Sequence, residues 1–273
     1  MSYALSEVQA QAERIELHTA SGMQVWHVWN KQAGRPMVLL HGGSGSWNHW
    51  VRNVLPLSKH RSVWALDTPG LGDSVLPEGA VDANDLHIPL EQGLQMLFAD
   101  QPLDIVGFSF GGLVAGFLAV DYPQRVSKLV LVGIPGLGLS NQILNMRGFK
   151  PSMSKHERDE VHRNNLMAIM LHEDKHITPE LLDMQEHNVV RDRLRRRRIA
   201  RSDAMLQLQR QWQCQVVGIW GEYDALYQGS LHLIKGLLSN CDLRAFHVVP
   251  GAGHWVQYEQ DLAFNQLLLH SLD

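Results

Sequence analysis

The segment Gly107-Phe108-Ser109-Phe110-Gly111-Gly112 decides how this sequence is interpreted. It fits the pattern G-x-S-x-G and lies between an apolar run, residues 103–108, and a run rich in small residues, 111–120. Between a strand and a helix, this pattern places the serine in a tight, strained turn with its Oγ above the strand end. Glycines two residues before and after the serine remove side chains that would collide there. We therefore predict that Ser109 is a nucleophile.

The rest of the chain alternates short apolar runs with segments of helical periodicity. Two antiparallel strands with a turn at Ser21-Gly22 are expected first, and near-continuous apolar strands follow. Such strands, separated by helices, form a parallel sheet that is covered on both faces. We expect strands at 13–18, 23–30, 36–40, 61–66, 103–108, 126–134, 216–220 and 243–249, and helices at 81–99, 111–120 and 262–272.

This alternation breaks between Pro135 and about Gln213, where the sequence is charged, helical in periodicity and without a clear strand. We expect a helical lid there, above the strand ends at which open α/β sheets bind ligands. The predicted organisation is therefore a core domain in two parts, 1–134 and 214–273, with a lid insertion at 135–213.

A serine hydroxyl needs a base within hydrogen-bond reach, and the base needs a carboxylate that orients it. In this architecture the chain order is serine, acid, histidine. His254 lies in a Gly-rich loop after the last expected strand, and Asp224 directly follows the strand at 216–220. Glu222 is a rival for the acid. We predict a triad of Ser109, His254 and Asp224.

Attack on a carbonyl group creates an oxyanion that needs preorganised hydrogen-bond donors. Phe110, the residue after the nucleophile, is expected to supply one backbone N–H. The second is expected from Gly43, with Ser44 as the alternative, in a Gly-rich loop after the strand at 36–40. Asp67 follows another strand end, and we expect it to hold its loop through backbone N–H groups.

Composition excludes several classes of partner. The formal net charge of −4 offers no case for nucleic acid or an anionic membrane, and the two cysteines lie in no metal-binding pattern. We expect no cofactor and no metal. The polar N-terminal stretch and the lack of an 18-residue apolar run predict no signal peptide and no membrane span, so the cytoplasm is the expected location. The expected partner is a small-molecule acyl substrate, and a homo-oligomer is possible.

The stretch Arg191–Arg198 is the most basic part of the chain. It could attract an anionic substrate or a nucleic acid. The preferred interpretation is a solvated helix face, balanced in part by acidic residues upstream: Glu173, Asp174, Glu180, Asp183 and Glu186.

At these motifs the sequence resembles the α/β-hydrolase superfamily over nearly its whole length. Within it, the segments Gly136-Leu137-Gly138, 177–182 and 253–259 look like those of the meta-cleavage-product hydrolases, which cut a carbon–carbon bond in 2-hydroxy-6-oxo-dienoates. The resemblance implies an α/β-hydrolase fold and places Trp255, with Phe108 and Ser44, in the substrate pocket.

Two positions depart from that family. It commonly has asparagine before the nucleophile, where this chain has Phe108. It also binds the substrate carboxylate with a lid arginine, and Gln185 stands at that position, with Arg191 two turns later. A buried carboxylate without a charged donor is costly. The leading hypothesis is thus hydrolysis of a small carboxyl ester or related acyl compound. Dienoate C–C hydrolysis and a non-catalytic ligand-binding protein are the alternatives.

Overall fold

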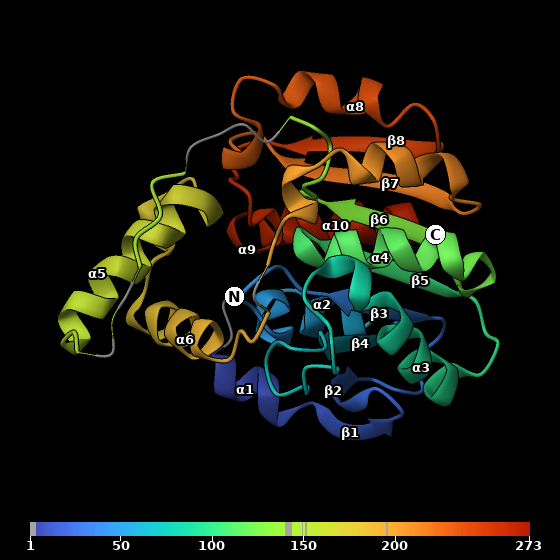
Figure 1. Cartoon of the computed structure of the whole chain (residues 1–273), viewed down its shortest axis with the longest axis horizontal. Coiled ribbons are helices and arrows are strands. Elements are labelled where there is room, and N and C mark those ends of the chain that lie inside the picture. Colours follow the sequence, from blue (N-terminus) through green and yellow to red (C-terminus); the bar gives the residue numbers. More distant parts are fainter. Residues whose placement is uncertain (1–3, 140–143, 149, 151, 195) are drawn as a thin grey trace.

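The computed structural model describes residues 4–139, 144–148, 150, 152–194 and 196–273. Its centre is an eight-stranded twisted sheet with the strand order β1-β2-β4-β3-β5-β6-β7-β8 (Figure 1). The strands are β1 (Glu13–Thr19), β2 (Gly22–Trp29), β3 (Pro36–Leu40), β4 (Ser62–Asp67), β5 (Leu103–Phe108), β6 (Val126–Val132), β7 (Gln215–Gly221) and β8 (Asp242–Val249).

The strand directions are those expected for an α/β sheet with an antiparallel N-terminal edge. β2 pairs antiparallel with both β1 and β4, and the five other pairings are parallel. All eight predicted strands are present, and β3 and β5 begin and end at the predicted residues. Every residue of β4 and β5 is buried, which explains why these strands appear as continuous apolar runs.

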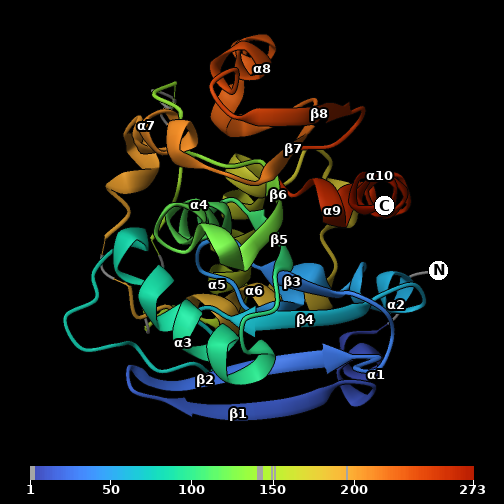
Figure 2. The same cartoon turned by 90° about the vertical axis from the view of Figure 1, so that its right-hand side faces the viewer.

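Helices cover both faces of the sheet (Figure 2). One face carries α3 (His87–Phe98), α4 (Phe110–Asp121), α7 (Ala204–Leu208) and α8 (Ile234–Leu237). The other face carries α2 (Val54–Ser58), α9 (Val256–Glu259) and α10 (Asp261–Leu272). The short helix α1 (Leu5–Ala10) lies close to α2. Two separate clusters of buried apolar side chains result, one under each layer. The α/β-hydrolase architecture predicted from the sequence is therefore the observed one.

Two local predictions had the wrong bounds. The helix expected over 81–99 is a short 3-10 turn, η2 (Ala83–Asp85), followed by α3, because Asp85 accepts hydrogen bonds from the N–H groups of Val81 and Asp82 and the chain turns there. The first hairpin reverses at residues 20–21, because Gly22, with φ +117°, already pairs with Thr19 as part of β2.

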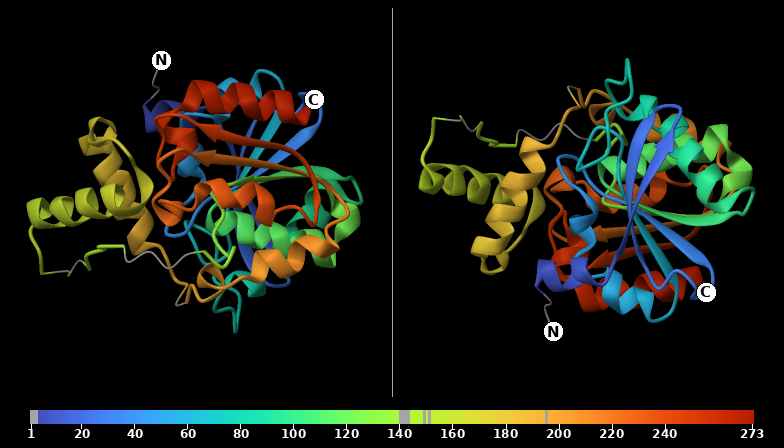
Figure 3. Two further views of the ribbon diagram at one scale, coloured as in Figure 1. Left: turned by 90° about the horizontal axis from the view of Figure 1, so that it is seen from above. Right: turned by 90° about the horizontal axis from the view of Figure 1, so that it is seen from below.

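Between β6 and β7 the described residues form helices and turns but no strand. α5 (Lys155–Asn165) runs into a π-helical turn, η4 (Leu166–Met170), and a short turn, η5 (Asp174–His176), precedes α6 (Pro179–Val190). α5 projects away from the sheet, whereas α6 lies nearer to it (Figures 1 and 3). This segment contacts the core through a hydrogen bond from the Trp255 N–H to the Met170 carbonyl, 2.7 Å.

The basic stretch is not a solvated helix face, which corrects the prediction. α6 ends at Val190, and the described residues that follow it, up to Arg198, form no helix. The upstream acids have other partners: Asp183 and Glu186 pair with Lys155 and Arg158. Arg191 instead pairs with Asp73 at 2.5 Å, and Arg197 pairs with Asp192 at 2.7 Å. Arg195 lies outside the described residues.

The remaining short 3-10 turns connect these elements: η1 (Trp47–Trp50), η3 (Pro123–Arg125), η6 (Ile199–Arg201), η7 (Gln209–Gln211), η8 (Ala225–Tyr227) and η9 (Leu231–Leu233). Among the described residues, no helix has the length and apolar character needed to cross a membrane.

Candidate active site

Ser109 lies in the sharp turn between β5 and α4. Its backbone has φ +50° and ψ −116°, a strained conformation for a residue with a side chain, and its N–H donates to the Val132 carbonyl at 2.8 Å. Its side chain is partly exposed, although Phe108 and Phe110 on either side are buried. This turn therefore presents the hydroxyl at the carboxyl end of the parallel strands, as predicted for a nucleophile.

Close backbone approach explains the glycines on both sides of Ser109. A Cβ on Gly107 would lie 2.5 Å from the Cα of Gly112, and a Cβ on Gly111 would lie 2.5 Å from the Leu40 carbonyl oxygen. Real Cβ atoms do not approach backbone this closely, and backbone cannot swing aside as a side chain can. The turn thus requires glycine for steric reasons.

The structure brings the three predicted triad residues together. His254 Nε2 lies 2.9 Å from Ser109 Oγ, and His254 Nδ1 lies 2.9 and 3.0 Å from the two carboxylate oxygens of Asp224. A carboxylate only accepts hydrogen bonds, so Nδ1 carries the proton and Nε2 is free to accept the Ser109 hydroxyl proton. His254 and Asp224 are each only 1% exposed.

Asp224, and not Glu222, lies beside His254. The exposed Glu222 accepts a hydrogen bond from the Gly251 N–H at 3.1 Å, so it contacts the histidine loop but not the ring. Gly133 follows β6 with φ +53°, and a Cβ there would lie 3.2 Å from both Asp224 Oδ2 and His254 Nδ1. This glycine leaves room for the acid and the imidazole at the end of β6.

The loop after β3 meets the turn at Ser109. A Cβ built on Gly43 would lie 3.7 Å from the Phe110 Cβ, so the two residues predicted to supply oxyanion donors are neighbours. As the first residue of α4, Phe110 has an N–H without an intrahelical acceptor. Ser44, the alternative donor, has φ +48°, and its hydroxyl donates to Asp192 at 2.6 Å.

Of the predicted pocket residues, Phe108 and Trp255 lie next to His254, and both of these aromatic side chains are fully buried. The Phe108 ring lies 5.1 Å from the His254 ring, and a Cβ on Gly42 would approach it to 2.9 Å. The Trp255 indole donates to the His49 carbonyl at 2.9 Å. That these residues and Ser44 line a substrate pocket stays a prediction.

Two buried histidines lie under the Gly-rich loop. Burial lowers the pKa of His41 to about 4 and the pKa of His49 well below the usual value. His41 Nε2 accepts the Thr68 N–H at 2.9 Å. The ring nitrogens of His49 have no partner among the described residues. Both imidazoles are therefore neutral near pH 7.

Asp67 holds its loop, as expected. Its carboxylate accepts the N–H groups of Trp47 at 2.8 Å and Asp73 at 2.9 Å. It is 1% exposed, and burial raises its pKa to about 6.

Sequence reasoning missed Glu259, on α9. Its two carboxylate oxygens accept the N–H groups of Gly253, at 2.6 Å, His172, at 2.9 Å, and Glu173, at 3.0 Å. It thereby connects the loop that carries His254 with the segment that follows η4. No spacing rule predicts this role, because the three N–H groups come from two segments far apart in the sequence.

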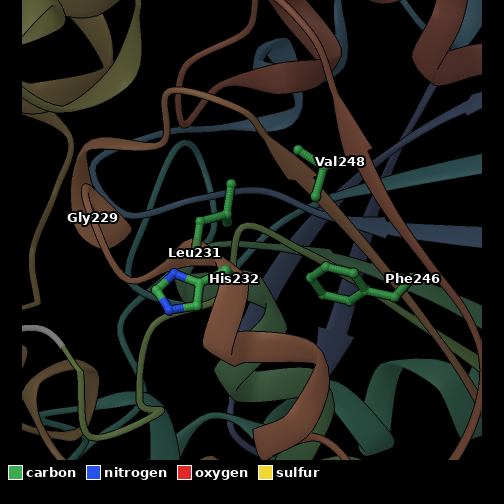
Figure 4. A pocket seen from close by; sticks show the side chains of 5 residues that line it. All are labelled: Gly229, Leu231, His232, Phe246 and Val248. Atoms are coloured by element: carbon green, nitrogen blue, oxygen red, sulfur yellow. The ribbon is translucent and has the colours of Figure 1, made fainter.

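A separate hollow of about 370 Å³ lies along the outer strand β8 and contains none of these residues (Figure 4). It is lined by Gly229, Leu231, His232, Phe246 and Val248. Within the described residues, no group of three or more His, Cys, Asp or Glu side chains is placed to hold a metal ion.

One protein-family model matches most of the chain. The model of the alpha/beta hydrolase family matches residues 37–267, which include all three residues of the predicted triad. The chain belongs to the alpha/beta hydrolase family. This assignment agrees with the sheet order and with the position of Ser109 at the turn into α4.

Relatives of this hydrolase include carbon–carbon bond hydrolases. It is 29% identical over 266 residues to a 2-hydroxy-6-oxononadienedioate/2-hydroxy-6-oxononatrienedioate hydrolase of Comamonas testosteroni, with 90% of each chain covered. A crystal structure of a variant of the meta-cleavage product hydrolase CumD has a TM-score of 0.75 and 25% identity, and covers 94% of this chain and 96% of its own. The carboxylesterase CesB of Bacillus subtilis, 19% identical with a TM-score of 0.75 and coverage of 97% and 94%, shares the fold.

Proposed function

We propose that this hydrolase cleaves a small carboxyl ester or related acyl compound through a covalent acyl-enzyme on Ser109. The observation that carries the proposal is the 2.9 Å separation between His254 Nε2 and Ser109 Oγ, with Asp224 buried against Nδ1. This geometry allows His254 to take the hydroxyl proton as Oγ attacks the carbonyl carbon.

The remaining steps follow from the same contacts. The N–H groups of Phe110 and Gly43 hold the carbonyl oxygen as it becomes negative. When the tetrahedral intermediate collapses, His254 returns the proton to the leaving alkoxide. A water molecule then loses a proton to His254 and attacks the acyl group, and His254 returns this proton to Ser109 Oγ as the acid is released. Asp224 keeps the imidazole in the required tautomer and stabilises its cation.

Turnover of p-nitrophenyl acetate and p-nitrophenyl butyrate tests this proposal. We expect the wild-type protein to release nitrophenolate from one or both esters, and Ser109→Ala to lose about three orders of magnitude or more in kcat. Equal rates for the two proteins would contradict an acyl-enzyme on Ser109.

Carbon–carbon bond hydrolysis of a dienoate is the second candidate, favoured by the dienedioate hydrolase among the relatives. It uses the same acyl-enzyme, but the leaving group is a carbon atom that must gain a proton. Gln185 stands where the family resemblance places an arginine, and the Gln185 side-chain oxygen is buried without a partner among the described residues. Loss of the dienoate absorbance on addition of enzyme would support this candidate, and no decay with several dienoates would exclude it.

Fluorophosphonate labelling distinguishes the two candidate hydrolase activities from a ligand-binding protein without catalysis. A reactive serine is labelled covalently, and an unactivated serine is not.

A further inference from the structure

Arg197, from the irregular stretch after α6, lies against the two residues predicted to hold the oxyanion. Its guanidinium carbon is 4.5 Å from the centre of the Phe110 ring. Its Nε atom lies 3.3 Å from the position that a Cβ on Gly43 would occupy. The positive charge of Arg197 also acts on His41, under the Gly43 loop, because Arg197 is one of the groups that lower the pKa of His41. A cation is thus built next to the site of attack.

The guanidinium is held in place from two sides. Asp192 accepts from Nη2 at 2.7 Å, and the Arg196 carbonyl accepts from Nη1 at 3.2 Å. The backbone immediately after Arg197 is fixed by Asp82, which is 5% exposed and accepts the N–H groups of residues 198 and 199 at 2.7 and 3.2 Å. An arginine that is already ordered loses less side-chain entropy when it binds a ligand.

These contacts leave N–H donors of Arg197 for a ligand, while Asp192 balances its positive charge. A guanidinium has five N–H donors, and only two of those of Arg197 have an acceptor among the described residues. The Asp192 carboxylate is shared, because it also accepts from the Ser44 hydroxyl at 2.6 Å and from the Leu194 N–H at 3.0 Å. The Arg197 side chain is 27% exposed, and Ser109, Gly43 and Ser44 are also partly exposed.

The other described arginines of this stretch are differently placed. Arg191 pairs with Asp73, and Arg193 donates to the carbonyls of Gly72 and Ser74. Arg196 and Arg198 are exposed to solvent. Of these, Arg197 is the one that contacts both Phe110 and the Gly43 position.

We infer that Arg197 binds a carboxylate on the acyl part of the substrate, and that the hydrolase therefore prefers acyl groups carrying an anionic end. This inference rests on the proposed function. The leaving group must face His254, which returns its proton, whereas Arg197 lies beside the loop that holds the carbonyl oxygen. A planar guanidinium with free N–H groups matches a carboxylate in shape and charge.

The test compares two esters of equal size, the p-nitrophenyl monoester of glutarate and the p-nitrophenyl ester of glutaramate, which ends in a neutral amide. Arg197→Gln is expected to lower kcat/KM for the glutarate ester about 10- to 100-fold, mainly through KM. It should change kcat/KM for the glutaramate ester less than about threefold. Arg197→Lys, which keeps the charge but not the planar fork, should fall between, and the exposed control Arg196→Gln should match wild type on both esters.

Two results would overturn the inference: an equal loss on both esters, which would make Arg197 a support for the Gly43 loop, or no loss on either. If wild type and Ser109→Ala hydrolyse both esters equally, the proposed function fails instead. The inference is then tested alone by titrating glutarate into wild type, Arg197→Gln and Arg196→Gln by calorimetry. Binding lost only in Arg197→Gln supports it, and binding that is absent or equal in all three contradicts it.

Discussion

The carboxyl ends of the strands, where Ser109, Asp224 and His254 lie, differ from the segment that joins β6 to β7 in how their side chains are held in position. At the strand ends, closely packed backbone fixes the positions of the side chains. The backbone contacts of Gly107 and Gly111 are examples. In the joining segment, side-chain contacts hold α6 and the stretch after it, together with a backbone hydrogen bond from the Arg193 N–H to the Gly70 carbonyl at 3.0 Å. Asn188 exchanges hydrogen bonds with Asn48, and Asp82 holds the backbone after Arg197.

We expect the first region to perform the reaction and the second region to determine which substrate is accepted. In the proposed function, the strand ends that carry Ser109, Asp224 and His254 perform the acyl transfer, and the segment that joins β6 to β7 selects the substrate. We therefore expect substitutions at the strand ends to abolish activity, and substitutions in the segment to alter substrate preference or to have small effects.

The largest effect is expected at the acid. Asp224→Asn retains the shape of the side chain but presents an N–H₂ group to His254 and favours the wrong imidazole tautomer, so kcat should fall about 10⁴-fold. Glu222→Gln is the matched control, because Glu222 contacts only the loop backbone. Ester kinetics would contradict the assignment if Glu222→Gln lost more activity than Asp224→Asn.

A methyl group at the nucleophile turn should destabilise the fold. Gly111→Ala places a Cβ 2.5 Å from the Leu40 carbonyl oxygen, and we expect a loss of about 3 kcal/mol in the free energy of unfolding. Gly148→Ala, in the segment between β6 and β7, meets no described atom within 4 Å and should cost less than about 0.5 kcal/mol. Urea unfolding measures both. Equal losses would mean that the two regions do not differ in packing.

Acid should weaken the sheet region. Burial lowers the folded-state pKa of His27 and of His41 to about 4, so below pH 6.5 the unfolded chain takes up protons that the folded chain does not. For each histidine, the free energy of unfolding is highest above pH 6.5 and falls as the pH falls towards 4. The loss is at most about 3 kcal/mol for each group. The raised pKa of Asp67 has the opposite effect, because the folded chain takes up this proton first and so gains stability as the pH falls from 6 to 4.

Urea midpoints between pH 7 and 4 check this prediction. The midpoint should fall with pH, and His27→Phe, which keeps a ring beside Trp47, should flatten the curve. A midpoint that rises with acid in wild type would show that Asp67 outweighs the histidines.

The smallest expected effect is at Glu259, which connects the two regions. Both of its oxygens accept backbone N–H groups, so the amide in Glu259→Gln must place its N–H₂ group against either the Gly253 side or the His172 side. We expect about a tenfold loss in kcat/KM and faster hydrogen exchange at residues 170–173. Unchanged exchange there, or an equal loss in Glu222→Gln, would show that the two regions are not connected through Glu259.

Sequence patterns predicted the sheet, the turn at Ser109 and the residues that meet there, because each depends on local chemistry: apolar strands, glycines at a tight turn and a fixed chain order. They did not predict the path of the chain after α6. Arg197 reaches the Gly43 loop only because Asp82 and Asp192, 110 residues apart, hold it, and no periodicity records such contacts. Glu259 was missed for the same reason.

The most direct test of the account is the site and rate of labelling by a fluorophosphonate, measured by peptide mass spectrometry. We predict one adduct, on Ser109, that is absent in Ser109→Ala and forms at least about 100-fold more slowly in His254→Gln, because Nε2 can no longer take the hydroxyl proton. An adduct on another residue, or labelling of Ser109→Ala at the wild-type rate, would contradict the assignment of Ser109 as the nucleophile.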